Sequence, residues 1–295
     1  MGEWAVPALP GAESRYGGGV PSLFATSDLH VTHEGNGPIV DEVVPDDPGD
    51  WLLVAGDVAE SAKVIRETLA RLRERFAKVV WVPGNHELWT TPNDECQLRG
   101  QARYEFLVEQ CREIGVLTPE DEFPVWDFGP EPLTVAPLFV FYDYSWRTPA
   151  TEGKTREEAL AHAREIGVVC TDEYYLHPDP YESRAAWCEQ RLKVSRDRLD
   201  AIPADRRTIL MSHWPLHRHP TNPLYYPDFA LWCGTTQTED WHLRYRAELA
   251  VYGHLHIPRT TSADGVRFEE VSLGYPREWR KRARGAVPVR KLLTA

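Results

Sequence analysis

The sequence predicts an α/β fold in one large domain. Short apolar runs that end at small or turn-forming residues alternate with amphipathic stretches of helical spacing, as in a sheet covered by helices. The chain has 295 residues, of which 42% are hydrophobic and 26% are charged, and these values are ordinary for folded globular proteins. The composition therefore predicts a buried core and argues against a disordered or fibrous chain.

The first part of the chain predicts a β-α-β unit. Residues 1–20 are rich in glycine and proline without periodicity, so we expect a flexible leader before the domain begins at residue 21. Between the second and third predicted strands, apolar residues recur at helical spacing over 64–76, with arginine and glutamate between them. Buried strands are predicted at 23–26, 51–55 and 79–82.

The rest of the chain predicts further strands and covering helices. Helical patterns lie over 97–114, 155–168 and 183–199, so we expect a helical insert around 150–205 within a single domain of residues 21–295. The Asp264-Gly265 pair predicts the turn of a hairpin whose return strand is 266–273. Other strands are predicted at 133–144, 208–211 and 249–252.

Charge and cysteine content limit the classes of partner. The net charge of −12 argues against broad binding to nucleic acid, which depends on many lysine and arginine contacts. The sequence has no apolar run long enough to cross a bilayer and no signal-peptide pattern, and its five widely spaced cysteines form no disulfide or zinc pattern. We therefore expect a cytoplasmic protein with reduced cysteines, no nucleic-acid partner and no membrane partner.

One stretch departs from this acidic balance. Between residues 277 and 291 a single acid, Glu278, accompanies a run of cations that includes Arg280, Lys281, Arg282, Arg284 and Arg290. A solvated tail is the plain interpretation, and a landing site for an acidic partner or a phosphate is the alternative.

Five short segments place metal-binding side chains directly after predicted strands. Open α/β sheets bind their ligands at strand ends in this way, so the segments predict one site at one edge of the sheet. The segments are SDLH, GDVAE, GNHE, SHW and GHLH, and they contribute Asp28, His30, Asp57, Asn85, His86, His213, His254 and His256.

Two of these segments hold paired ligands at a spacing of two residues. Asp28 and His30 form one pair, and His254 and His256 form the other. In an extended backbone the side chains at i and i+2 point the same way, so each pair can hold one ion from one side. Taken alone, either pair is better explained by surface or structural residues.

The other three segments complete the set. Gly56 allows a tight turn before Asp57, whose two carboxylate oxygens can bridge two cations about 4 Å apart, although a helix cap is the alternative. The amide oxygen of Asn85 can ligate a metal, whereas His213 alone is weak evidence. The conjunction of all five segments, each after a strand, predicts a metal site better than any one of them.

The order of these motifs resembles the signature of the calcineurin-like metallophosphoesterase superfamily, with no ligand missing between Asp28 and His256. The resemblance implies a sandwich of two mixed β-sheets flanked by helices, and two divalent metal ions bridged by Asp57. The first ion would be held by Asp28, His30, Asp57 and His256, and the second by Asp57, Asn85, His213 and His254.

Such a centre implies hydrolysis of a phosphate ester. Two cations lower the pKa of a bound water and offset the charge of the phosphoryl oxygens. His86 lies beside a ligand without being one, so we expect it to protonate the departing alkoxide, and a purely orienting role is the alternative. Mixed carboxylate, amide and imidazole ligands suit manganese or iron best, with zinc as a further option.

Longer stretches narrow the resemblance to the actinobacterial phosphopantetheinyl hydrolase branch of this superfamily. They are VPGNHELWTT, LWCGTTQTEDWH, YGHLHIPRTT and DGVRFEEVSLGYPREW. The resemblance implies that holo-acyl carrier protein is the substrate and that the phosphodiester to 4′-phosphopantetheine is cleaved. Four aromatic residues are candidates for a wall along the pantetheine arm, with ordinary packing as the alternative: Trp214, Tyr225, Tyr226 and Trp232.

Other functions are compatible with the same motifs. A small-molecule phosphomonoesterase or a cyclic-nucleotide phosphodiesterase would use the same metals, so small phosphoesters remain candidate substrates. A non-catalytic binding scaffold is expected to lose ligands or the donor histidine, and here the set is complete. The sequence carries no signal for a particular oligomeric state.

Overall fold

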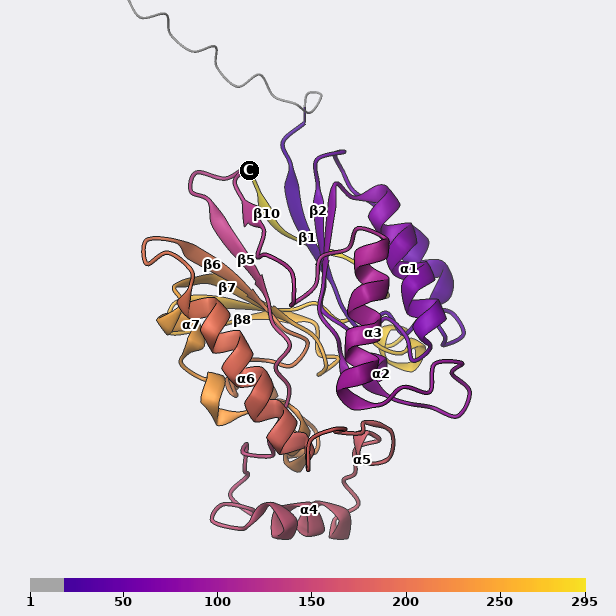
Figure 1. Cartoon of the computed structure of the whole chain (residues 1–295), viewed down its shortest axis with the longest axis vertical. Coiled ribbons are helices and arrows are strands. Elements are labelled where there is room, and N and C mark those ends of the chain that lie inside the picture. The colour runs from indigo at the N-terminus through magenta and orange to yellow at the C-terminus, as the bar shows by residue number, and fades with distance from the viewer. Residues whose placement is uncertain (1–18) are drawn as a thin grey trace, which may run out of the picture.

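The computed structural model describes residues 19–295 of the chain. Within this part, two β-sheets pack face to face and carry helices on their outer surfaces (Figure 1). The first sheet has four strands in the order β10-β1-β2-β3, and the second has six in the order β4-β5-β6-β7-β9-β8. This arrangement confirms the predicted α/β sandwich of two mixed sheets flanked by helices.

The first sheet contains the predicted β-α-β unit. Its strands are β1 (Ser22–Thr26), β2 (Trp51–Val54), β3 (Lys78–Trp81) and β10 (Arg290–Thr294). The first three are parallel neighbours, and β10 pairs antiparallel with β1 at the edge. Helices α1 (Ala62–Arg75) and α3 (Gly100–Glu113) cover the outer face, where their apolar residues form one buried cluster with the strands.

The second sheet also has a parallel centre and antiparallel edges. Its strands are β4 (Val125–Trp126), β5 (Leu133–Pro137), β6 (Arg207–Met211), β7 (Ala247–Tyr252), β8 (Arg259–Ala263) and β9 (Val266–Glu270). The predicted hairpin joins β8 to β9 through Asp264 and Gly265, both with positive φ, as a two-residue turn requires. Helices α6 (Arg184–Asp200) and α7 (Trp241–Arg244) contribute to the buried cluster on the outer side.

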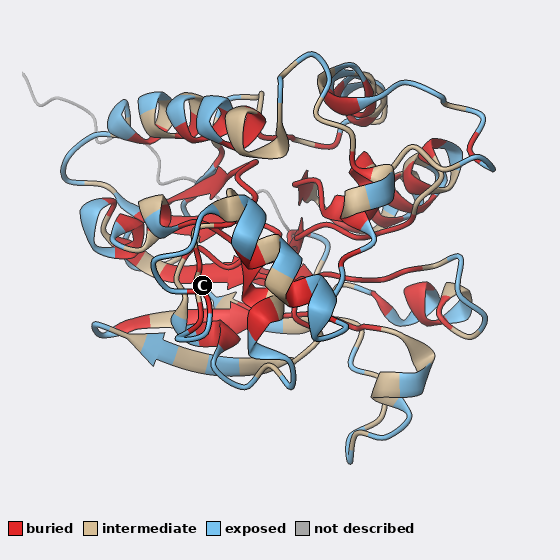
Figure 2. Cartoon of the chain, turned by 90° about the horizontal axis from the view of Figure 1, so that it is seen from below, coloured by how far each residue is buried: buried red, intermediate tan, exposed pale blue. Residues whose placement is uncertain are grey.

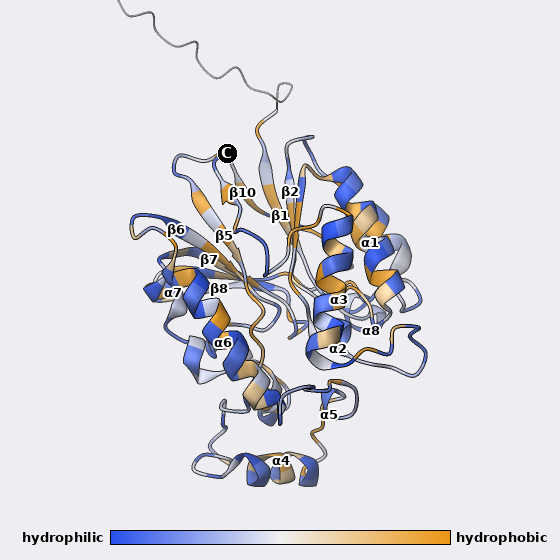
Figure 3. Ribbon diagram, viewed as in Figure 1, coloured by the Kyte–Doolittle hydropathy of each residue, from blue (hydrophilic) through white to orange (hydrophobic). Residues whose placement is uncertain are grey.

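The core between the sheets is purely apolar at its centre. Leu23 and Leu53 of the first sheet share a buried cluster with Val135, Ile209 and Leu249 of the second. Buried residues concentrate in the strands and in the loops that follow them, whereas the outward faces of the helices are exposed and hydrophilic (Figures 2 and 3). The packed sheets therefore hold the loops at the carboxyl ends of the parallel strands in fixed positions.

The remaining elements are short and lie in the connections. They are the helices α2 (Asn85–Leu88), α4 (Arg156–Glu165), α5 (Asp172–Tyr175) and α8 (Pro276–Trp279), and the 3₁₀ helices η1 (Gly37–Glu42), η2 (His219–Thr221), η3 (Pro227–Trp232) and η4 (Thr236–Thr238). Helices α4, α5 and α6 occupy the predicted insert, and α4 lies at the far end of the molecule (Figure 1). Thr155 and Ser183 cap α4 and α6 by accepting hydrogen bonds from backbone N–H groups.

Two predicted strands are too long. The return strand predicted at 266–273 ends as β9 at Glu270, and the other overruns further. The sequence predicts a strand through 133–144, but β5 ends at Pro137, and residues 138–144 continue as buried irregular chain. The pairing with β6 ends one residue later, where the Leu138 N–H donates to the carbonyl oxygen of Met211 at 2.7 Å, although the apolar side chains beyond it remain inside. The short edge strands β4 and β10 were not predicted, because two residues or a solvated tail carry little apolar pattern.

Some expectations lie outside what the structure tests. Residues 1–18 of the predicted leader fall outside the described part of the chain, and the division into a leader and a single domain from residue 21 stays a prediction. Among residues 19–295, no helix has the length and apolar character needed to cross a membrane.

Candidate metal centre

The predicted site residues meet at one edge of the two sheets, where the parallel strands end. Asp28 and His30 follow β1, Asp57 follows β2, Asn85 and His86 open α2 after β3, His213 follows β6, and His254 and His256 follow β7. All are buried except His256, whose side chain is 14% exposed. Both halves of the sandwich therefore contribute to one cluster, as the motif order predicts.

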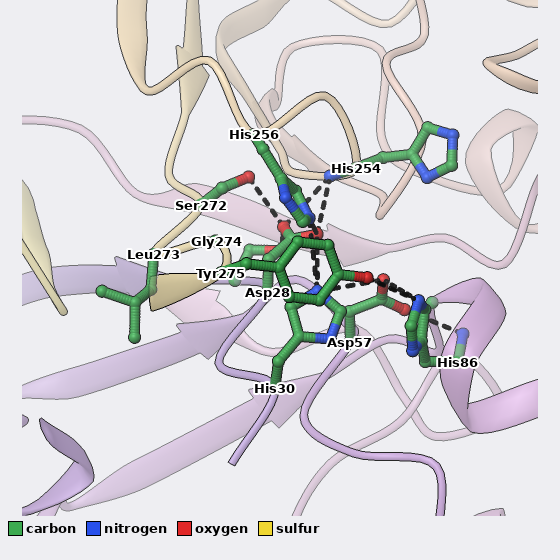
Figure 4. Close-up of polar contacts among 12 residues, drawn as sticks. Asp28, His30, Asp57, His86, His254, His256, Ser272, Leu273, Gly274 and Tyr275 are labelled. Atoms are coloured by element: carbon green, nitrogen blue, oxygen red, sulfur yellow. Dashed lines mark hydrogen bonds and ion pairs between the residues drawn. The ribbon is translucent and has the colours of Figure 1, made fainter. Parts of the chain in front are cut away.

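One group of donors surrounds Asp28. His256 Nε2 lies 2.9 Å from Asp28 Oδ1 and 3.2 Å from His30 Nε2. Three donor atoms, one each from Asp28, His30 and His256, lie within 4.8 Å of one another, which is compatible with a shared ion (Figure 4). Carboxylate and imidazole donors at this density are typical of a metal position.

A second group surrounds Asn85. Its Oδ1 lies 3.1 Å from His213 Nε2 and 3.2 Å from His254 Nδ1, and these two nitrogens are 3.2 Å apart. Asp57 lies between the groups, with Oδ2 3.8 Å from His30 Nε2 and 3.5 Å from His213 Nε2. This is the position that a bridging carboxylate would need.

The electrostatics of the cluster fit cations. Burial lowers the pKa of His213 to about 4 and that of His254 well below its ordinary value, so both imidazoles are neutral with free lone pairs. Burial raises the pKa of Asp57, and the nearby Asp28 and Glu87 carboxylates raise it further. Buried acids crowded in this way are stabilised by positive charge placed between them.

The surroundings of His256 also favour a positive charge. Burial opposes a charge on its ring, but the carboxylates of Asp28 and Glu278 raise its pKa to about 10. Its Nδ1 lies 2.7 Å from Glu278 Oε2, which fixes the ring and leaves Nε2 facing Asp28. A cation at this place would substitute for the proton, and a carboxylate behind a histidine ligand is the usual supporting arrangement.

The backbone of the paired ligands differs from the prediction. Instead of being extended, Asp28, His30, His254 and His256 all have left-handed conformations, with φ of 52°, 41°, 69° and 55°, and the unpaired Asp57 shares this conformation with φ of 56°. Non-glycine residues in this region cost of order 1–3 kcal/mol each and persist where the surrounding structure determines them, commonly at functional sites. The pairs converge as expected, but a strained turn rather than an extended strand achieves it.

The glycines of the motifs serve two different purposes. Gly56 has φ of 84° and makes the predicted turn before Asp57. Gly84 has φ of −98°, which any residue adopts, so it serves by leaving room: a Cβ there would collide with the Asp57 carboxylate. The alternative that Asp57 caps a helix is also ruled out, because α1 begins after Ser61.

Glu87 supports the ligand loops from beneath. It is fully buried, and its two carboxylate oxygens accept hydrogen bonds from the backbone N–H groups of Asp57, Val58 and Gly84 at 2.8–2.9 Å. The sequence placed Glu87 in the GNHE motif without a role. The structure shows that it ties the loop after β2 to the start of α2.

Asp172 is a supporting residue that the sequence analysis missed. This fully buried side chain of α5 accepts hydrogen bonds from Asn85 Nδ2 at 3.0 Å, Trp89 Nε1 at 2.7 Å and Tyr142 OH at 2.9 Å. The first bond orients the Asn85 amide so that Oδ1 faces the two histidines. No local pattern marks Asp172, because it lies in the insert, far from the motifs in sequence.

His86 lies at the border of the cluster, where one of its ring nitrogens is within 4.8 Å of donor atoms of His30 and Asp57. Its Nδ1 lies 2.7 Å from Glu60 Oε1, and its Nε2 lies 3.3 Å from the hydroxyl of Tyr275. The Glu60 carboxylate is desolvated by burial, but its hydrogen bond to His86 holds its pKa at about 2. Tyr275 also stacks on His30 with ring centroids 4.4 Å apart, so it covers the ligands (Figure 4). Glu60 closes the GDVAE segment and Tyr275 lies in the last of the longer stretches, but the sequence assigned neither of them a role.

A cleft of about 590 Å³ opens over this cluster. Its floor includes Asp57, Asn85 and His86, and its walls come from three segments: 169–171 of the insert, 223–229 before and within η3, and 275–278 around α8. The aromatic wall predicted from four residues is only half right. Tyr225 and Tyr226 line the cleft and are 87% and 59% exposed, whereas Trp214 and Trp232 are buried in the core.

Comparisons with known proteins agree with this geometry. A family model described as calcineurin-like phosphoesterase matches residues 22–258. An acyl-carrier-protein phosphodiesterase of Mycobacterium tuberculosis is 55% identical over 265 residues, which are 90% of this chain and 81% of that protein. The crystal structure of phosphopantetheinyl hydrolase from Mycobacterium tuberculosis matches with a TM-score of 0.91 and 53% identity, covering 94% of this chain and 97% of the other.

Proposed function

The chain belongs to the calcineurin-like phosphoesterase family, and we propose that this hydrolase cleaves the phosphodiester between 4′-phosphopantetheine and the serine of an acyl carrier protein. The observation that carries the proposal is the extent of the likeness to the Mycobacterium tuberculosis phosphodiesterase, which spans the metal motifs and the cleft walls together. A complete donor set supports an enzyme rather than a binding scaffold.

The donor groups support a binuclear metal centre. We assign Asp28, His30, Asp57 and His256 to the first ion and Asp57, Asn85, His213 and His254 to the second, with manganese or iron preferred and zinc as a further option. Two divalent cations held there would supply positive charge to the phosphoryl oxygens and lower the pKa of a water. The chain contributes the fixed positions of the donors, which the strained loops and Glu87 maintain.

His86 is the proposed general acid. Water attacks phosphorus, the bond between phosphorus and the serine oxygen breaks, and that oxygen must receive a proton as it leaves. Glu60 holds His86 through Nδ1, so that Nε2 points to the reacting side, where Tyr275 provides a further hydroxyl. The products are free 4′-phosphopantetheine and a carrier protein with an unmodified serine.

Intact mass spectrometry of the carrier tests the proposal. Manganese-loaded protein is incubated with holo-acyl carrier protein and, in parallel, with bis-p-nitrophenyl phosphate. We expect the carrier to lose the mass of phosphopantetheine, and the His86→Ala variant to leave the carrier intact. Turnover of the small diester without any change in the carrier would contradict the carrier substrate and favour a small-molecule phosphoester, including a cyclic nucleotide.

Several expectations about partners and place stay predictions of the sequence. They are a cytoplasmic location, the absence of nucleic-acid and membrane partners, and small phosphoesters as further substrates.

A further inference from the structure

The C-terminal cations divide into two sets. Three are already engaged: Arg282 donates to the carbonyl oxygens of Leu273 and His256 at 2.7 and 3.1 Å, Arg290 pairs with Glu269 at 2.7 Å, and Lys291 pairs with Asp46 at 2.5 Å. The other four are exposed and form no ion pair within 4.0 Å among residues 19–295: Arg277, Arg280, Lys281 and Arg284. We call these four the α8 patch.

The α8 patch adjoins the mouth of the catalytic cleft. Arg277 lines the cleft, and it also lines a neighbouring hollow together with Arg280, His33 and Glu34. Helix α8 itself connects the two regions, because Glu278 holds His256 and the preceding Tyr275 reaches His86. A macromolecule that contacts the patch would therefore be positioned directly over the site.

Two of the arginines are held in place by aromatic rings. The guanidinium of Arg277 lies 5.3 Å from the ring centroid of Tyr275, and that of Arg280 lies 5.2 Å from the ring centroid of Trp279. Trp279 is itself fixed, because its Nε1 donates to Asn36 Oδ1 at 2.9 Å. Two of the four cations of the patch thus stand at defined positions, and ordered charges lose less entropy on binding.

The α8 patch is basic, whereas the chain as a whole is acidic. The protein carries a net charge of −12, so an acidic protein would be repelled from most of its surface. We infer that the α8 patch is the docking surface for an acidic carrier protein, which it attracts and orients so that the serine-linked phosphodiester enters the cleft. This inference rests on the proposed function, since it names the surface that recognises the proposed substrate.

Point substitutions are the clean way to test the patch. Removal of the chain after Gly274 would also remove Tyr275 and Glu278, which touch the site. The test variant is Arg280→Ala/Lys281→Ala/Arg284→Ala, which leaves the cleft-lining Arg277 intact. The matched control is Lys193→Ala/Arg207→Ala/Arg244→Ala, which removes the same charge from exposed cations that do not line the cleft.

The readout is the ratio of kcat/KM for holo-acyl carrier protein to kcat/KM for bis-p-nitrophenyl phosphate. At low salt we expect the test variant to lower this ratio about tenfold, mainly through KM for the carrier, because charges at a rim act on encounter. The control should keep the wild-type ratio. Adding about 0.5 M NaCl should shrink the difference, since screening weakens long-range attraction. The variant Arg280→Lys/Arg284→Lys, which keeps the charge, should restore most of the ratio.

Equal ratios for the test variant, the control and the wild type would overturn the inference. So would a test variant that loses affinity for vesicles of anionic phospholipid while its carrier kinetics stay at the wild-type level. Failure of the wild type to release phosphopantetheine is a separate result, because it refutes the proposed function. In that case the docking role of the α8 patch is tested by the affinity of the protein for holo-acyl carrier protein alone. Equal affinities of the wild type and the test variant would refute that role.

Discussion

The floor and the rim of the cleft are built in opposite ways. The floor, which comprises the proposed metal donors and His86, is buried apart from His256 and strained in its backbone. It is fastened by hydrogen bonds that the carboxylates of Glu60, Glu87, Asp172 and Glu278 accept. The rim, which comprises Val169, Tyr225, Tyr226 and Arg277, is exposed. A rigid floor suits the hydrolysis step, which is the same for every phosphate ester. Exposed side chains at the rim can contact the rest of the substrate, so they suit discrimination between esters.

This contrast predicts two kinds of variant. Substitutions in the floor should lower turnover of every substrate together, because they change the reacting centre. Substitutions in the rim should change the preference for the carrier protein over a small diester. A floor variant that altered only substrate preference would break the comparison.

Asp57→Asn should give the largest effect. The amide has one oxygen and no charge, so it cannot bridge two cations, and we expect loss of metal from both positions and a fall in activity of about a thousandfold. Elemental analysis of the dialysed protein and turnover of both substrates are the measurements. Two fully occupied metal positions in this variant would rule out the bridging role.

His86→Ala should come next. We expect metal content near that of the wild type, while turnover of both substrates falls by about two orders of magnitude or more, the usual scale of a general acid. Glu60→Gln is the companion variant, because it keeps the shape of the acceptor of His86 Nδ1 but removes its charge. Unchanged turnover in His86→Ala would leave this histidine only an orienting role.

Asp172→Ala should have an intermediate effect and act through the second ion. Without the carboxylate the Asn85 amide is free to rotate, so we expect metal affinity at one position to fall about tenfold or more, as for other residues that orient ligands. Tyr142→Phe is the control, since it removes another hydrogen bond to Asp172 but leaves the bond from Asn85. Titration with manganese measures both, and equal losses in the two variants would mean that Asp172 serves packing rather than ligand orientation.

The rim should give the smallest change. Tyr225→Ala/Tyr226→Ala removes exposed aromatic area from the cleft wall, so we expect KM for the carrier to rise about threefold to tenfold, with a smaller change for the diester. Tyr174→Ala is the matched control, because Tyr174 is 69% exposed but does not line the cleft. A rise in KM that is the same for both substrates would assign the tyrosines to general access rather than to recognition of the carrier.

The sequence alone was sufficient to predict the layered fold and the eight residues that lie together at one edge of the sheets. Each of them follows a short apolar run typical of a buried strand, and the ends of parallel strands meet at one edge, so their proximity could be predicted without coordinates. The ability of each side chain to bind a metal depends on its residue type, and the sequence gives the residue type directly.

Only the tertiary structure identified the residues that hold the donors and the surfaces that face a substrate. Asp172 and Asn85 are 87 positions apart, and Tyr275 and His86 are 189 apart, so no periodicity or motif links them. Likewise, the cations of the C-terminal stretch look alike in sequence, yet Arg282 and Arg290 are engaged in internal polar contacts while Arg280 and Lys281 are exposed and form no ion pair within residues 19–295. Pairing and exposure depend on which distant segments the fold brings near, and that information lies in the packing of the chain rather than in any short stretch of it.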